Sequence, residues 1–393
     1  MNDKGIALPI ALIMMAVLVS LIVAFLVLAT SEPLIASNQK VGTQARALAE
    51  TGIERALWAL TKGDTNPGFP GALDPASTNP SAAPYNGATF VQVSNLGQFS
   101  VTVADGAVNE KVITAVGWVP SNANPIAVKK IQVRAIRIKH IDPPCALCAG
   151  GESPPGTNAE IQVGGTATVN AAPGVNPFTG QSNYCAGVTP TTAVMAQGPV
   201  IVNGTPNLSA PTGGTTTAPN TPSSRFSDFV FTDYDMAYLK GLAQSNGTYY
   251  QGNTTFTSPP KDGIVFIDTP SGLPLSTSSP SSDVITLDIH GNWSTGFRGW
   301  IIVAGSAVIR GQIAITGLVY SQNDVTLDGV GTGAIRGAVI STNRRDTSST
   351  NIDSANIGQA PLFYDCNAVR SGGGVLPQGW TMRPGTFVEQ QGR

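Results

Sequence analysis

The chain has 393 residues, of which only 12% are charged, and its formal net charge is −2. It is longer than one typical domain, and its near-neutral charge excludes a global basic field that would attract nucleic acid or anionic lipid. The 44 glycines and 29 prolines, together with many Ser, Thr and Asn residues, favour short strands and turns over helices in most of the chain.

Residues 6–29 form an apolar run that only Pro9 and Ser20 interrupt. As a helix it would be about 36 Å long, enough to span a hydrocarbon core of about 30 Å. Lys4 precedes the run and the next basic residue is Lys40, which predicts a cytoplasmic N-terminus with the rest of the chain outside. A single-pass anchor and a secretory signal are both possible, but the apolar part of a signal is usually about 7–15 residues long.

An amphipathic segment follows the apolar run. Ser31-Glu32-Pro33 is a helix-start signal and Gly63 a stop signal. Between them small and apolar residues recur at three- and four-residue steps, namely Ala45, Leu48, Ala49, Gly52, Ile53, Ala56, Leu57 and Leu60. The pattern predicts one long helix over 6–63, with a transmembrane half at 6–30, an amphipathic half at 33–62 and a kink near Pro33 or Gly42.

This arrangement resembles type IV pilins, in which a short basic leader ends in glycine before an apolar and then an amphipathic helical half. The stretches IALPIALIMM and ARALAETGIERALWAL resemble PilX-type minor pilins and the large tip pseudopilin of type II secretion. The resemblance implies a leader at 1–5, cleavage by prepilin peptidase between Gly5 and Ile6, and helix packing in a filament core. The core-packing residues would include Ile10, Leu12, Leu21 and Phe25.

One position departs from the major pilins, which carry a glutamate five residues after the cut. Here that residue is Ile10. A buried carboxylate without its partner costs several kcal/mol, so the absence of the carboxylate suits a subunit with no neighbour above it. We therefore expect a tip or initiating subunit of low copy number.

A pilin-like antiparallel β domain is predicted over 64–140, after a turn-rich stretch at 64–84. Its strands are expected at Thr89–Val93, Gln98–Val103, Lys111–Val119 and Val128–Lys139. The last strand holds the one basic cluster of the chain, which comprises Lys129, Lys130, Arg134, Arg137, Lys139 and His140. Alternation splits these charges between two faces. The pattern favours an edge strand protected by basic side chains, with nucleic-acid contact as the weaker alternative.

The second half of the chain contains an internal repeat. RGWIIVAGSAVIRG, ITGLVYSQNDVTLDG and IRGAVISTN align on Gly299, Gly317 and Gly337, with a looser copy at Gly263. Units this small must stack to bury their apolar faces, which predicts an all-β right-handed parallel β-helix over 161–370. A partly helical insertion at 223–250 would cap or flank the open end of this β-helix. Residues 141–160 are predicted as a linker and 371–393 as a C-terminal tail.

The four cysteines are Cys145, Cys148, Cys185 and Cys366. Their number and the Cys-x-x-Cys spacing fit either a zinc site or two disulfides. The topology places them outside the cytoplasm, where disulfides persist, so disulfides are favoured over a metal. Their connectivity is left open.

No catalytic, metal or cofactor motif emerges. The acids of NDVTLDG and SDVITLD fit turn chemistry, and His290 has no nucleophile partner in a recognisable motif. The resemblance implies a minor pilin, in the inner membrane before assembly and in an extracellular pilus afterwards. Its partners would be other pilin subunits, inner-membrane assembly proteins, prepilin peptidase, and a surface ligand or DNA. The alternatives are a membrane-anchored β-helix enzyme acting on polysaccharide and a surface adhesin unrelated to pili.

Overall fold

The structure is a computed structural model. It describes residues 7–65, 84–107, 110–139, 141–150, 159–172, 192–227, 229–329, 333–345, 352–359, 361–376 and 379–391. The chain forms two compact units. The first unit comprises Met1–Arg137 with Gly379–Arg393, and the second comprises Ile138–Gln378.

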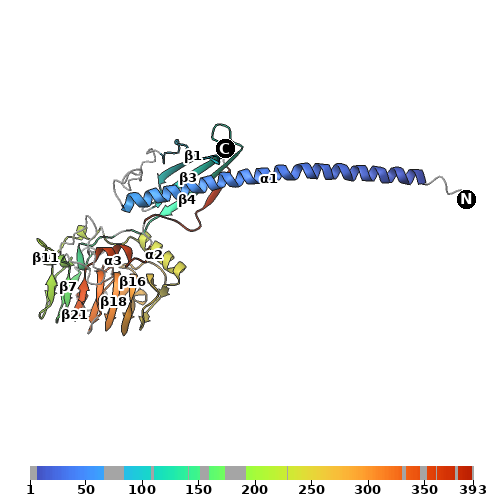
Figure 1. Ribbon diagram of the computed structural model, residues 1–393. Coiled ribbons are helices and arrows are strands. Elements are labelled where there is room, and N and C mark those ends of the chain that lie inside the picture. The colour runs from blue at the N-terminus through green and yellow to red at the C-terminus, as the bar shows by residue number, and fades with distance from the viewer. Residues whose placement is uncertain are drawn as a thin grey trace. The chain divides into compact units, whose positions relative to one another are not determined.

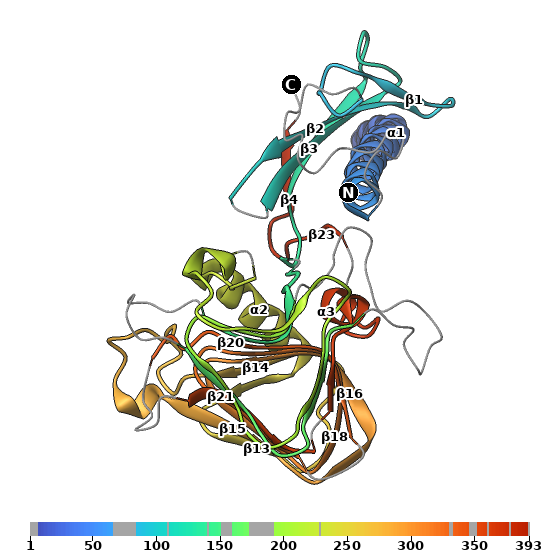
Figure 2. The same ribbon diagram turned by 90° about the vertical axis from the view of Figure 1, so that its left-hand side faces the viewer.

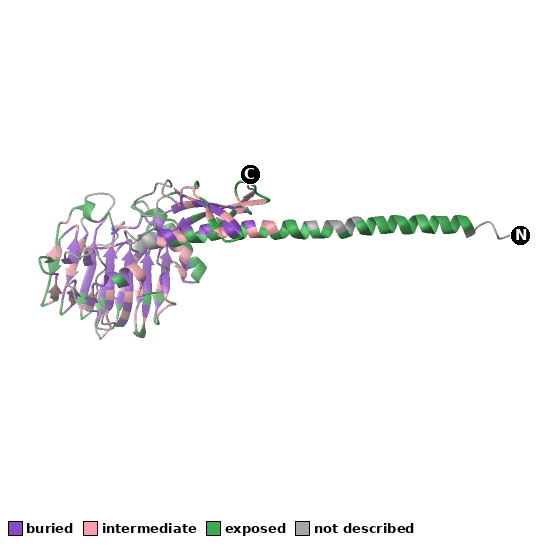
Figure 3. Cartoon of the chain, turned by 45° about the horizontal axis from the view of Figure 1, so that its top comes forward, coloured by how far each residue is buried: buried purple, intermediate pink, exposed green. Residues whose placement is uncertain are grey.

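The first unit is built on one long helix, α1 (Ala7–Thr65), which has 59 residues (Figure 1). Pro33 lies inside it, at the predicted junction of its two halves. Proline lacks the amide donor of an internal helical residue and usually kinks a helix, yet the helix continues through this position. Figure 3 shows that the buried residues of α1 are confined to its C-terminal half.

A sheet packs on this C-terminal half. It contains the antiparallel strands β1 (Val91–Val93), β2 (Gly97–Asp105), β3 (Glu110–Val119) and β4 (Ala127–Ile136), in sequence order. Alternate side chains of these strands, such as Val101 and Val133, face the apolar stripe of α1 and form one buried core with it. The predicted helix and meander are confirmed.

One position makes the close contact between α1 and the sheet possible. A Cβ atom at Gly117 of β3 would overlap the carbonyl oxygen of Ala45 and would lie 2.8 Å from the backbone nitrogen of Ala49. Only glycine lets the helix backbone come so near the strand. Small residues on the helix, Ala45 and Ala49 among them, complete the fit.

The end of the chain returns to this sheet. The strands β23 (Thr381–Met382) and β24 (Val388–Gln391) both pair antiparallel with β4. The predicted tail 371–393 thus contains two strands, and β4 is an internal strand instead of the predicted edge. The sequence of β23 and β24 shows no alternation of apolar and polar residues. These strands extend a sheet whose core is already formed by α1 and the other strands, so they need few apolar side chains of their own.

The second unit consists mainly of two parallel sheets (Figures 1 and 2). One sheet contains β5 (Cys145–Ala149), β7 (Thr168–Asn170), β8 (Thr192–Ala196), β10 (Asn207–Ser209), β11 (Thr215–Ala218), β12 (Tyr249–Gln251), β14 (Gly263–Asp268), β16 (Asn292–Val303), β18 (Gln312–Ser321), β20 (Ile335–Ser341) and β22 (Pro361–Phe363). The other contains β6 (Glu160–Val163), β9 (Val200–Val202), β13 (Thr254–Phe256), β15 (Ile285–Ile289), β17 (Gly305–Arg310), β19 (Val325–Gly329) and β21 (Ile352–Gly358).

Successive strands from β12 to β22 alternate between these two sheets. Each pass through both sheets is called a coil here. Inward side chains such as Val265, Ile301, Val319 and Val339 stack on successive coils in one apolar core. The unit has parallel sheets with a shared interior, as the repeat predicts.

The glycine alignment is confirmed by the strand register. Gly263, Gly299, Gly317 and Gly337 lie side by side on β14, β16, β18 and β20. All four have positive φ, from 126° to 145°, a range that L side chains rarely adopt. We call these four residues the glycine ladder.

The order of the coils in space differs from their order in the sequence. The coil of β5, β6 and β7 pairs with the coil of β20, β21 and β22 on one side, and with the coil of β8, β9 and β10 on the other. The first coil in the sequence, β5 to β7, therefore lies inside the stack, and the strands β8 to β11 extend the stack on one side of it. The chain then passes to the opposite end of the stack, where β12 and β13 form the first strands. From there the later coils add one after another until β20 to β22 lie beside the first coil. As a result, the unit begins and ends in neighbouring coils.

Residues 141–160, predicted as a linker, include β5, whose five residues are all buried. The prolines before it indicate a link, but the strand CALCA is a full member of the sheet. The predicted helical insertion contains two short elements, η2 (Ser223–Arg225) and α2 (Asp233–Asn246). A further short turn, η3 (Ser281–Asp283), and a short helix, α3 (Cys366–Ser371), complete the unit.

The helix α2 begins at a capping box formed by Thr232 and Asp235 and ends at Gly247 in the left-handed conformation. Its apolar side chains, including Met236 and Leu239, pack on the outer face of the first sheet against Phe266 and neighbours. The segment therefore flanks the first parallel sheet on its outer face, and the expected covering of the open end of the stack stays a prediction.

Candidate assembly surface

The N-terminal half of α1 presents an unburied apolar surface. Within the described residues, Leu8–Leu26 is long and apolar enough to cross a membrane, with a mean hydropathy of 2.8, and none of it is buried. The predicted packing residues Ile10, Leu12, Leu21 and Phe25 are between 48% and 70% exposed. The described residues of this half of the helix are coloured as exposed in Figure 3, and a helix that is apolar all round requires lipid or other helices around it. Gly5 and Ile6 lie outside the described residues.

A charged cluster marks the place where α1 meets the edge of the sheet. The Arg46 guanidinium lies 2.8 Å from Glu50 and 3.7 Å from Glu389 of β24, and Lys129 of β4 lies 2.6 Å from Glu389. The guanidinium also lies 5.6 Å from the ring centroid of Phe387. We call Arg46, Glu50, Lys129 and Glu389 the collar.

The two pKa shifts in the collar follow from its contacts. The hydrogen bond from Lys129 holds the pKa of the Glu389 carboxyl below its usual value. The hydrogen bond to Glu50 raises the pKa of the Arg46 guanidinium. The collar therefore joins the helix, β4 and the last strand through ion pairs.

A groove of about 650 Å³ runs beside the collar. Ile35, Asn38, Gln39, Gly42 and Thr43 line it from the helix, and Arg46, Lys129 and Glu389 close it at one end. Ile35 is exposed and is the apolar side chain of a lining that is otherwise mostly polar or charged. The groove and the exposed half of α1 together form the candidate assembly surface.

The predicted nucleic-acid strip is largely occupied by internal contacts. Lys129 is paired with Glu389, and Arg134 lies 2.7 Å from Glu110, whose side chain is buried. The Arg137 guanidinium lies 5.3 Å from the ring centroid of Trp380.

The remaining cations of the strip are divided between the two units. Lys139, in the second unit, donates to the carbonyl oxygen of Val230. Lys130 has no side-chain partner in the described part of the chain, and His140 lies outside it. The strip therefore offers no continuous row of free cations for a phosphate backbone.

The cysteines form disulfides where they are described. Cys145 and Cys148 are joined across β5, and Cys366 is also disulfide-bonded. Cys185 lies outside the described residues. Because a cysteine binds zinc as a free thiolate, the disulfide-bonded Cys145 and Cys148 do not provide the alternative zinc site.

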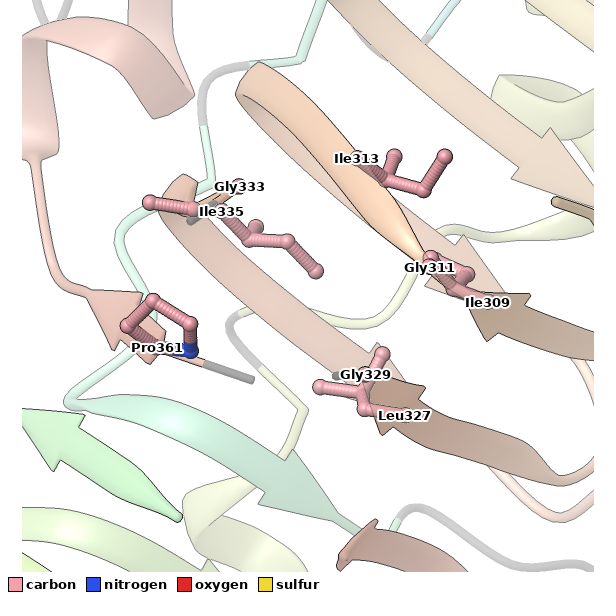
Figure 4. A pocket seen from close by; sticks show the side chains of 9 residues that line it. Ile309, Gly311, Ile313, Leu327, Gly329, Gly333, Ile335 and Pro361 are labelled. Carbon is pink, nitrogen blue, oxygen red and sulfur yellow. The ribbon is translucent and has the colours of Figure 1, made fainter. Parts of the chain in front are cut away.

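The two acids of SDVITLD make local contacts. Asp283 accepts a hydrogen bond of 2.7 Å from Ser271, and Asp288 lies 3.5 Å from Arg310 and 3.4 Å from His290. An internal cavity of about 20 Å³ lies near β18 and β20, and Figure 4 shows Ile313, Leu327 and Ile335 around it. Its lining is mainly apolar, and no carboxylate or other titratable side chain lines it.

The contacts that sequence reasoning missed are all long-range. The Asp142 carboxylate accepts two hydrogen bonds of 2.7 Å from Arg370, which ties the entry of the second unit to its exit. Glu110 and Glu389 neutralise the basic strip from other strands. No local pattern marks these partners, because each depends on strand register.

No protein-family model and no curated protein matches the chain. Among solved structures, the crystal structure of the competence-associated pilin ComZ from Thermus thermophilus is similar to it, with a TM-score of 0.25 and 12% sequence identity. The similarity covers 89% of this chain and 97% of that chain. At this TM-score the likeness adds no argument to the geometry described above.

Proposed function

We propose that the chain is a minor pilin of a type IV pilus-like filament. Prepilin peptidase would cleave it after Gly5, and the apolar half of α1 would leave the inner membrane to pack among the helices of other subunits. The observation that carries this proposal is α1 itself. It is one continuous helix whose first half is apolar and unburied and whose second half is built into an antiparallel sheet.

An ordinary membrane anchor does not account for this helix. An anchor needs a span of about 20 residues, whereas α1 has 59 and continues directly into the core of a folded domain. Such continuity transmits the position of the helix rigidly to the sheet. This is the property that a filament subunit needs and a flexible tether does not.

The second unit would be the part displayed outside the filament. We propose that its coils form a right-handed parallel β-solenoid, which the alternating parallel sheets, the glycine ladder and the three-sided outline in Figure 2 support. Asp283 and Asp288 engage in local contacts, which favours display and adhesion over catalysis. DNA capture has less support, because the basic strip is occupied by internal contacts.

The residue at position 10 favours a place at the filament tip. Ile10 replaces the carboxylate that would pair with a neighbouring subunit, so the subunit lacks one link of a repeating contact. The proposed partners are other pilin subunits and inner-membrane assembly proteins.

The test is the mass of the mature chain in cells with and without prepilin peptidase. We expect a product that begins at Ile6 when the enzyme is present and the full precursor when it is absent. Gly5→Leu should block cleavage by obstructing the scissile position, whereas Asn2→Ala, three residues upstream, should leave it intact. A mature chain that retains Met1 beside an active peptidase contradicts the proposal.

A further inference from the structure

One end of the stack of coils in the second unit carries no charge. It consists of β9, β10 and β11, whose only partner strands among the described residues are β6, β7 and β8. β11 is labelled at this end of the stack in Figure 1. No residue between Glu160 and Arg225 is charged, so all three strands lie within an uncharged stretch of the sequence. We call β9, β10 and β11 the neutral end.

The neutral end leaves part of the apolar core open. Val202 occupies an inward position, in register with the fully buried Val163, yet it is 47% exposed. The opposite end of the stack is closed differently. There Tyr250 and Phe256 occupy the inward positions, with their ring centroids 5.0 Å apart, and Phe256 is buried. Two large rings thus lie over the core at one end, whereas short aliphatic side chains end it at the other.

The backbone of the neutral end is also unprotected. Exposed edge strands are usually shielded by charged side chains or by proline, and β9 (Val200–Val202) contains neither. The Pro199 carbonyl oxygen and the Asn203 nitrogen bond to β6. Since alternate residues of a strand direct their backbone groups to opposite sides, those of Val200 and Val202 point away from the stack. They are available to pair with a further strand.

We propose that the neutral end pairs with the neutral end of a second copy of this chain, across a two-fold axis at Ile201. Such an axis makes the two β9 strands antiparallel, so that Val200 of each chain exchanges backbone hydrogen bonds with Val202 of the other. Ile201 then lies opposite Ile201 of the second copy, with the Cβ atoms about 4.5–5.5 Å apart. The contact covers the exposed side of Val202.

The absence of charge favours this occupant. An identical surface meets itself across a two-fold axis, and charged residues near that axis would face like charges. Depletion of charged residues is also the compositional mark of interface cores. The inference goes beyond the proposed function and uses neither α1 nor the cleavage at Gly5, so the two proposals can fail separately.

The first experiment is disulfide cross-linking of the detergent-solubilised full chain. Ile201→Cys should give a disulfide-linked dimer under mild oxidation, because the two Cβ atoms lie within reach of a disulfide. The matched control is Thr255→Cys, the exposed central residue of β13, which is the edge strand of the same sheet at the opposite end. It should stay monomeric. A mixture of the two variants should give no mixed dimer, since only head-to-tail stacking brings opposite ends together. Failure of Ile201→Cys to cross-link, equal cross-linking of the control, or a mixed dimer would each overturn the proposal.

The second experiment exchanges charges and is measured by sedimentation velocity. Ile201→Lys and Ile201→Glu should each weaken self-association by about tenfold or more, since like charges then face each other across the axis. A mixture of the two variants should associate again, because unlike charges face each other. Ile201 is 37% exposed, so both variants should keep the Tm of the unaltered chain. An unaltered chain that sediments as a monomer, or a mixture that stays monomeric, would mean that this end binds a different partner and would overturn self-pairing.

Discussion

Gly317 lies at the centre of the glycine ladder, where both its backbone conformation and its neighbour exclude a side chain. Its φ is 145°, and a Cβ atom would overlap the carbonyl oxygen of Gly299 on the preceding coil. Gly263 shares the conformation, with a φ of 126°, but a Cβ atom there would meet nothing within 4 Å. The two positions therefore separate conformational strain from steric overlap.

We predict that Gly263→Ala lowers the free energy of unfolding of the second unit by about 1–3 kcal/mol, the range for a strained backbone conformation. Gly317→Ala should cost about 1–3 kcal/mol more, because overlap with the next coil adds to that strain. Urea unfolding followed by circular dichroism measures both. If the two variants lost the same free energy of unfolding, a Cβ atom at position 317 would not overlap the neighbouring coil, and the close packing at the glycine ladder would be wrong.

At the scale of elements, the collar links α1, β4 and β24 through Glu389. The folded-state pKa of this carboxyl lies below the usual 4.5. Its contribution to the docking of β24 is therefore fully present above about pH 4.5 and is lost as pH falls through the lower, folded-state pKa. The groups are partly exposed, so the effect on stability is small.

We predict that Lys129→Gln returns the pKa of Glu389 towards 4.5, because it removes the hydrogen bond that lowers it. The matched control is Lys130→Gln, which changes the next residue of β4 and a side chain without a partner among the described residues. Carbon-detected NMR of glutamate side chains, assigned with Glu389→Gln, gives the titration directly. A shift of the same size in both variants would contradict the pairing of Lys129 with Glu389.

Elements with their own periodicity were predictable from the sequence. The apolar and amphipathic halves of α1 follow from residue spacing, and the meander and the glycine ladder follow from alternation and repetition. β5 was not predictable, since five apolar residues after two prolines fit a link as well as a buried strand. The collar was also not predictable from the sequence, because Arg46 and Glu389 come together only when the end of the chain pairs with β4.

At the scale of the whole molecule, the second unit is an insertion between two strands of the first. β4 and β23 are paired, so the inserted unit must begin and end at neighbouring points. A stack wound in sequence order would place its two ends at opposite ends of the stack. The order seen here, with β5–β7 beside β20–β22, solves this problem, and the ion pair of Asp142 with Arg370 fixes the two ends together.

This organisation predicts that the C-terminal segment Gly379–Arg393 stabilises the first unit and not the second. Besides pairing with β4, the segment donates a hydrogen bond of 3.0 Å from the backbone of Trp380 to Thr61 of α1. Deleting Gly379–Arg393 should lower the calorimetric transition of the first unit, because β4 loses both strands on that side and Trp380 leaves the core. The transition of the second unit should stay unchanged, since its coils are complete without the segment. The control variant Met382→Ala changes an exposed side chain of β23 and keeps the backbone pairing, so it should leave both transitions in place. If the deletion shifted both transitions equally, the two units would not unfold independently, and the description of the second unit as a self-contained insertion would be wrong.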